Sequence, residues 1–131
     1  MPVKTMIDLE KDTTEHIATG DVVDSEMFEA QRDFYENGPT RIQLWDMTGC
    51  SVTAITIGGM RTFIERAARK GVVRKDGKTA VIVSSQLQFG LARMAEAFGE
   101  FSSLPFAFSV FKDRAEALAW LNEKSEEMAD G

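Results

Sequence analysis

The chain has one cysteine and one histidine among its 131 residues, which removes several common kinds of site. A single cysteine cannot form an internal disulfide, and this favours a reducing compartment such as the cytoplasm. One histidine with one cysteine is too few for a typical zinc site, so we expect no metal and no other cofactor. A cysteine nucleophile needs a base, and His16 is the only histidine. Because no catalytic constellation is evident, we do not expect an enzyme.

Long uncharged apolar runs are also absent, so no transmembrane segment is expected. The amino terminus, MPVKTMIDLEKD, lacks the apolar core of a signal peptide. The 15 Lys and Arg against 21 Asp and Glu leave a net charge of −6, which argues against nucleic acid as a partner. The 44% hydrophobic and 27% charged residues are typical of a globular protein. We expect one cytoplasmic domain over residues 1–131, with a frayed polar tail over about 123–131.

Hydrophobic periodicity predicts alternating strands and helices. Strands are expected at 3–9, 14–19, 41–47, 79–83 and 105–111. Helices are expected after Asp24 or Ser25, over 56–70, after Ser84 or Ser85, and after Asp113. The third helix is expected to bury Leu87, Leu91, Met94, Ala95 and Phe98. The order β-β-α-β-α-β-α-β-α predicts an α/β fold with four helices and a mixed, mostly parallel sheet, whose first two strands form an antiparallel edge.

The stretch LWDMTGCSVTAITIGGMRTF at 44–63 runs from a strand through hydroxyl residues and a glycine pair into a helix. This stretch, the order of elements and FKDRAEALAWL at 111–121 resemble the STAS domain, and within it the SpoIIAA-like anti-sigma-factor antagonists. Members carry a strand ending D-[LF]-S, then Asp-Ser-Ser/Thr-Gly at the start of the next helix. DMTG at 46–49 looks like the strand end, and ungapped alignment then places four residues at the second motif: Ala54, Ile55, Thr56 and Ile57.

The resemblance implies a binding or regulatory module rather than a catalyst, with a protein or a small ligand as its partner. The serine that is phosphorylated in antagonists of this family is missing from the chain. Thr56 stands beside its place and is the candidate phospho-acceptor.

Hydroxyl and amide side chains follow two of the predicted parallel strands. In open α/β sheets, ligands favour the crevice beyond the carboxyl ends of the strands, where helix N-termini can hold an anion. We call the surface expected there the rim. Its residues are Thr48, Ser51, Thr53, Thr56, Ser84, Ser85 and Gln86. The alternative is purely structural, because serine and threonine also cap helices.

Two other functions are kept as alternatives. Cys50 lies in the same predicted loop, and a nearby helix start would lower the pKa of its thiol, so a thiol-dependent enzyme is the first. His16 is expected to be a half-exposed strand residue that nothing brings near Cys50. The second alternative is a carrier of an apolar or lipid-like ligand, because phenylalanines surround the last strand. They are Phe98, Phe101, Phe106, Phe108 and Phe111. The same residues would suit a homodimer, which we expect.

Positive charge is concentrated in RTFIERAARKGVVRKDGK at 61–78. We call its core the basic patch. Its residues are Arg66, Arg69, Lys70, Arg74 and Lys75. Cations late in a helix interact favourably with its carboxyl end by about 0.3–1 kcal/mol each, but they would equally suit an acidic partner. No aromatic stacking platform accompanies them, which again argues against nucleic acid.

Overall fold

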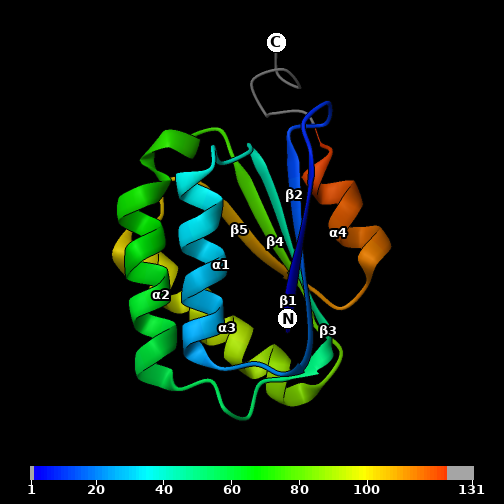
Figure 1. Ribbon diagram of the computed structural model, residues 1–131, viewed down its shortest axis with the longest axis vertical. Helices are drawn as coiled ribbons and strands as arrows, with labels where there is room; N and C mark the ends of the chain where they lie inside the picture. Colours follow the sequence, from blue (N-terminus) through cyan, green and yellow to red (C-terminus); the bar gives the residue numbers. More distant parts are fainter. Residues whose placement is uncertain (1, 124–131) are drawn as a thin grey trace.

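The computed structural model describes residues 2–123 and shows strands alternating with helices (Figure 1). Its strands are β1 (Val3–Asp8), β2 (Thr13–Asp21), β3 (Ile42–Ser51), β4 (Lys78–Ile82) and β5 (Ala107–Phe111). Its α-helices are α1 (Asp24–Glu36), α2 (Ile57–Lys70), α3 (Gln86–Ser102) and α4 (Arg114–Leu121), with a short 3-10 helix, η1 (Gly71–Arg74), after α2. No helix in this part of the chain is long and apolar enough to cross a bilayer. Apart from Glu123, the tail predicted to fray lies outside the described residues.

The strands form one five-stranded sheet in the order β1-β2-β3-β4-β5. β1 pairs with β2 in antiparallel fashion, and every other neighbouring pair is parallel. The α/β class, the element order and the antiparallel edge predicted from the sequence are therefore confirmed. Each right-handed crossover moves one strand further in the same direction, so α1, α2 and α3 lie on one face of the sheet. α4 follows the last strand and lies on the other face (Figure 1).

Buried side chains fill both sides of the sheet. Beneath α1 and α2, the main cluster comprises Ala18, Val22, Met27, Trp45, Met47, Cys50 and Val52. Beneath α4, the cluster comprises Ile42, Leu44, Ala80, Ile82, Ala117 and Leu121. β3 contributes to both clusters because successive strand residues point to opposite faces. β3 and β4 are interior strands of the sheet, and because they are parallel their carboxyl ends lie at the same edge.

β3 is longer than the strand predicted at 41–47. It continues to Ser51, so Thr48 and Ser51 are strand residues rather than loop residues. The additional residues pair with residues 19–21 of β2, beyond a register shift between Ile17 and Thr19. Because this pairing joins segments about 30 residues apart, no local hydrophobic pattern indicates that β3 extends beyond residue 47.

Two helices differ in detail from the prediction. α1 begins after Val23, whose N–H donates to Glu26 Oε1 at 2.9 Å, so neither Asp24 nor Ser25 is its cap. In α3, Leu87 was predicted to face inward but is exposed. Ala95 is buried as predicted, and the other buried residues of α3 are Gln88, Ala92 and Gly99, so that four residues of the helix are buried. Three of the four are small, which lets α3 pack closely.

Candidate functional site

The carboxyl ends of β3 and β4 are joined by hydrogen bonds from Ser84 and Gln88. Ser84 Oγ donates to Thr48 O at 3.1 Å, and Gln88 Nε2 donates to Cys50 O at 2.7 Å. Gln88 Oε1 also accepts the Ser84 N–H at 2.8 Å. The structure thus brings Thr48 and Ser84, two of the predicted rim residues, into direct contact. Gln88, which holds them together, was missed, and its only sequence signal was the helical spacing that it shares with Ala92.

Thr56 and Ser85 cap the two helices that begin at this edge. Thr56 Oγ1 accepts the Gly59 N–H at 2.9 Å, and Ser85 Oγ accepts the Gln88 N–H at 3.1 Å. Each bond satisfies one N–H group that the first turn of a helix leaves without a partner. The capping role weighed from the sequence is therefore present at both residues, while both side chains remain on exposed residues.

Asp24 ties the N-terminus of α1 to that of α2. Its Oδ1 accepts the Thr56 N–H at 3.0 Å, and its Oδ2 accepts the Thr56 hydroxyl at 2.6 Å. A Cβ on Gly59 would overlap the Asp24 carboxylate, so glycine is required for this close approach. Asp24 was predicted as a candidate cap of α1, and its partner Thr56 lies 32 residues away in the chain, beyond any local pattern.

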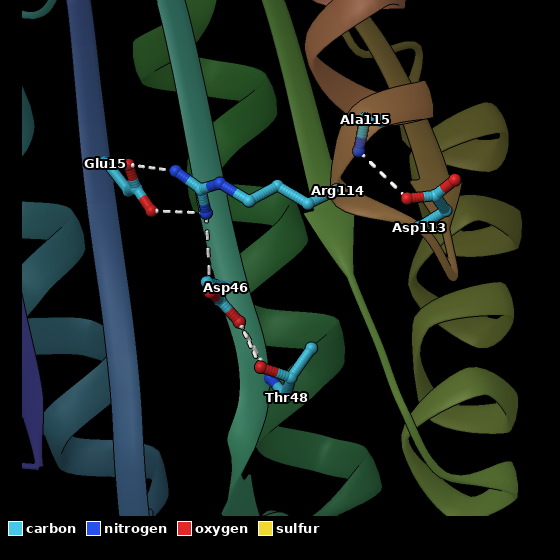
Figure 2. Close-up of polar contacts among 6 residues, drawn as sticks. All are labelled: Glu15, Asp46, Thr48, Asp113, Arg114 and Ala115. Carbon is cyan, nitrogen blue, oxygen red and sulfur yellow. Dashed lines mark hydrogen bonds and ion pairs between the residues drawn. The ribbon is translucent and has the colours of Figure 1, made fainter.

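Thr48 is linked to the opposite face of the sheet (Figure 2). Its N–H and hydroxyl donate to Asp46 Oδ1 at 3.0 and 2.6 Å. Arg114 is the first residue of α4. Its Nη1 and Nη2 donate to Glu15 Oε2 and Oε1 at 2.8 and 2.9 Å, and Nη1 also lies 3.5 Å from Asp46 Oδ2. The hydrogen bond to Glu15 raises the pKa of the Arg114 guanidinium. This ion-paired chain anchors α4 to β2 and β3 and occupies the polar groups of Thr48.

The remaining rim residues are in solvent-accessible positions. Ser51 Oγ lies 3.1 Å from Thr53 Oγ1, and Gln86 is exposed at the start of α3. Within residues 2–123, neither the Ser51 nor the Thr53 side chain forms a hydrogen bond with the capping residues Thr56 and Ser85. The rim is thus a series of local contacts along one edge and not a convergent pocket.

Three exposed apolar side chains stand among these polar groups. Ile57 begins α2 and is 60% exposed, Leu87 lies in the first turn of α3 and is 57% exposed, and Val23 immediately precedes α1. The three helices follow β2, β3 and β4, which are parallel, so all three begin at the same edge of the sheet (Figure 1). This grouping was not predicted, because apolar residues at helical spacing are more often part of the core.

Cys50 does not have the chemistry of a reactive thiol. It is buried, and its Sγ donates to Met47 O at 3.3 Å. Burial, with a smaller contribution from Asp46, raises the pKa of the Cys50 thiol to about 11. The predicted lowering of this pKa is wrong, because Cys50 belongs to β3 and the N-terminus of α2 is capped by Thr56 instead.

His16 is fully buried, so the prediction of a half-exposed strand residue is wrong. Its ring centroid lies 4.1 Å from that of Trp45 and 5.8 Å from that of Phe34. Burial, helped by the charge of Arg74, lowers the pKa of His16 to about 3, and the ring is neutral at physiological pH. Within residues 2–123, no group of three His, Cys, Asp or Glu side chains is placed to hold a metal ion.

Arg74 was predicted in the basic patch but is buried, with 3% of its surface exposed. Its guanidinium lies 4.5 Å from the ring centroid of Phe106 and 5.2 Å from that of Phe34. Its N–H groups donate to five acceptors. They are Thr40 O, Arg41 O, Lys78 O, Gln43 Oε1 and Thr79 Oγ1. A charge satisfied by main-chain carbonyls is a structural element and not a partner surface.

The rest of the basic patch lies at the carboxyl end of α2. Arg69, Lys70 and Lys75 are exposed, while Arg66 stacks on Phe28, with its Cζ 4.7 Å from the ring centroid. Thr56 caps the other end of the same helix, roughly 21 Å away for 14 residues at 1.5 Å each. The basic patch and the rim are therefore separate surfaces.

An apolar cavity of about 70 Å³ lies between the sheet and the three helices on its larger face. Trp45, Phe63 and Phe108 are among the side chains that line it. A cavity of about 150 Å³ can bind benzene, and this one is about half that size, which is small for a lipid-like ligand. Around β5, Phe101 is exposed, whereas Phe106 is buried. The apolar surface expected there is consequently smaller than the sequence suggested.

One solved structure similar to this chain is described as an uncharacterized protein from the DUF3478 family with a SpoIIAA-like fold, from Shewanella loihica PV-4. The alignment covers 91% of each chain at 18% identity, with a TM-score of 0.59. The chain has a SpoIIAA-like fold. The fold that the resemblance implied is therefore confirmed. No family model matches the chain, and neither does any curated protein.

The SpoIIAA-like fold explains why the rim residues lie along one edge. Its parallel strands present their carboxyl ends together, and α2 and α3 both begin there. At this edge Thr56 caps α2 and Ser85 caps α3. In this chain, helix caps, the Asp24 bridge and exposed apolar residues therefore lie at the same edge of the sheet.

Proposed function

We propose that this SpoIIAA-like domain is a non-catalytic protein-binding module. Its contact surface is the rim together with the exposed Val23, Ile57 and Leu87. The observation that carries the proposal is the grouping of these apolar side chains at three helix N-termini, surrounded by exposed polar residues. An apolar centre with a polar border is the usual anatomy of a protein interface.

The chemistry of the described residues supports binding over catalysis. The Cys50 thiol is protonated at neutral pH, and the neutral His16 is enclosed by aromatic rings. Glu15 and Asp46, two partly buried carboxylates, are both engaged in ion pairs with Arg114. A small ligand is a weaker candidate than a protein, because the hydroxyl groups of Thr48, Thr56, Ser84 and Ser85 already take part in hydrogen bonds within the chain.

Phosphorylation of Thr56 would regulate binding at the proposed surface. Its hydroxyl donates to Asp24 Oδ2, and a phosphate there would replace this donor with a dianion beside a carboxylate. The resulting repulsion would separate Asp24 from Thr56 and so alter the surface around Ile57. Phosphorylation of Thr56 would therefore disconnect the module from its partner.

Site-specific crosslinking in the source organism tests the proposal. A photoreactive amino acid is placed at Thr53 or Gln86 on the rim, and at Glu116 on α4 as a control on the opposite face. We expect a discrete crosslinked protein from the rim positions and none from Glu116. Equal crosslinking from both faces would overturn the proposal.

The crosslinked protein is then purified and its affinity measured with single variants. Leu87→Asp, Thr56→Glu and Ser85→Glu are expected to weaken binding at least tenfold, about 1.4 kcal/mol, because each places charge in the contact. Leu118→Asp is the matched control, since Leu118 is an exposed leucine on α4. Normal binding by all three rim variants would show that the rim is not the contact surface.

A further inference from the structure

β1 is an edge strand with a free side. It pairs only with β2, and residues 4–9 are all exposed, including Met6 at 44% and Ile7 at 55%. In Figure 1 no helix covers its outer side. An exposed strand edge with apolar side chains is a template for pairing with another strand.

The backbone groups on the free side can be identified from the pairing with β2. The Thr19 N–H donates to Pro2 O at 2.7 Å, so Pro2 and Thr19 form a hydrogen-bonded pair. Hydrogen-bonded and non-hydrogen-bonded pairs alternate along an antiparallel ladder. The N–H and C=O groups of Thr5 and Ile7 therefore point away from β2, toward the free edge.

The charges on β1 are arranged symmetrically about Met6. Lys4 lies two residues before Met6 and Asp8 two residues after it, on the same face of the strand. Neither side chain forms a salt bridge within residues 2–123, although Asp8 Oδ1 accepts the Lys11 N–H at 3.2 Å. When two copies of such a strand run antiparallel with Met6 opposite Met6, each Lys4 stands opposite an Asp8.

We propose that β1 pairs with β1 of a second copy of this chain, antiparallel and centred on Met6, so that two five-stranded sheets join into one. Thr5 of each chain exchanges both backbone hydrogen bonds with Ile7 of the other. Lys4 faces Asp8 across the junction twice. The inference is independent of the rim, which lies at the carboxyl ends of the parallel strands.

The same register accounts for the exposed apolar residues of this region. Met6 packs against its own symmetry mate, and Leu9 of each chain comes beside Val3 of the other. Shifting the register by two residues in one direction would place Lys4 opposite Met6, and shifting it in the other would place Lys4 opposite Glu10, which lies in the turn beyond β1. Only the register centred on Met6 pairs Lys4 with an acidic residue that belongs to β1 itself.

The pairing closes on itself. A two-fold axis through the Met6 pair uses β1 of both chains completely, so no β1 edge remains for a third copy. The product is a dimer of defined size and not a fibre. It differs from the homodimer expected around β5, which would use the other edge of the sheet.

Sedimentation equilibrium of the full chain at low ionic strength tests the proposal. We expect a species of twice the 14.6 kDa chain mass that dissociates on dilution. The chain sedimenting only as a monomer up to about millimolar concentration, far above typical dimer affinities, would overturn it.

Two sets of variants separate this junction from any other dimer. Ile7→Pro removes an outward N–H without touching the β1–β2 ladder and should abolish the dimer, whereas Ile7→Thr keeps the N–H and should retain it. Circular dichroism establishes that both variants are folded. A dimer that survives Ile7→Pro would overturn the proposal.

Charge exchange gives a test that does not depend on proline. Lys4→Asp and Asp8→Lys, made singly, each place like charges opposite one another and should weaken the dimer about tenfold. The double variant restores opposite charges and should return the dissociation constant to within about threefold of the original. Failure of the double variant to recover, with both single variants weakened, would contradict this register.

Discussion

Gln43 Nε2 donates a hydrogen bond to the buried His16 Nε2 at 3.0 Å, and Arg74 determines the direction of that bond. Arginine can only donate, and Arg74 Nη1 lies 3.4 Å from Gln43 Oε1. Thr79 Oγ1 donates to the same oxygen at 3.0 Å, so the amide nitrogen of Gln43 must face the histidine. His16 then carries its proton on Nδ1 and donates it to Thr5 Oγ1 at 2.9 Å.

This orientation predicts a pH-dependent stability. The pKa of His16 is lowered from 6.5 to about 3 in the folded chain, so the unfolded chain binds a proton that the folded chain does not. The free energy of unfolding should fall as pH drops from 6.5 toward 3, by up to about 1.4 kcal/mol per pH unit. Urea unfolding at pH 7, 6 and 5, above the range where most carboxylates titrate, measures the slope. His16→Gln should flatten it, and an unchanged slope in that variant would contradict the assignment.

Arg74 should be essential for stability and not for partner binding. Arg74→Met removes the donor of the buried Thr40 O and one donor each of Gln43 Oε1, Thr79 Oγ1, Arg41 O and Lys78 O. It should lower the free energy of unfolding by about 3 kcal/mol. Its exposed neighbour Lys75 is the matched control, and Lys75→Met should change stability by less than about 0.5 kcal/mol. Equal effects in denaturant unfolding would mean that the buried network is not formed in solution.

Two adjacent glycines should respond oppositely to alanine. At Gly58 a Cβ meets nothing within 4 Å, so Gly58→Ala should stabilise the helix by about 0.5–1 kcal/mol. At Gly59 a Cβ would overlap the Asp24 carboxylate, so Gly59→Ala should displace Asp24 from Thr56 and lose that gain. Thermal unfolding of both variants measures the difference. Identical shifts would show that the Asp24 bridge does not hold α1 against α2.

Cys50 should be inert in the native protein. With its pKa raised to about 11, only about one thiol in a thousand is ionised at pH 8. Iodoacetamide should alkylate the native chain at least about 100-fold more slowly than the unfolded chain, in which a thiol has its ordinary pKa. Because Cys50 is the only cysteine, mass spectrometry reports it without ambiguity. Rapid alkylation of the native protein would contradict this prediction and support the alternative that the protein is a thiol-dependent enzyme.

The candidate site divides into parts that local sequence could predict and parts that it could not. Thr56 and Ser85 were predicted at helix starts because a cap bonds to an N–H only three residues further along the chain. The Asp24 bridge and the Gln88 link join residues 32 and 38 positions apart, and no local pattern indicates either. The exposure of Ile57 and Leu87 depends in turn on which side of each helix meets the sheet.

The sequence by itself determined the order of the elements, the mixed α/β sheet and the helix caps Thr56, Ser85 and Asp113. Hydrophobic periodicity and capping both act over only a few residues. Only the tertiary structure decided that His16 and Arg74 are buried, that β3 continues to Ser51, and that the Cys50 thiol is protonated. Burial, desolvation and strand pairing depend on segments that meet through folding. A charged or titratable side chain looks the same in sequence whether water or a neighbouring helix surrounds it.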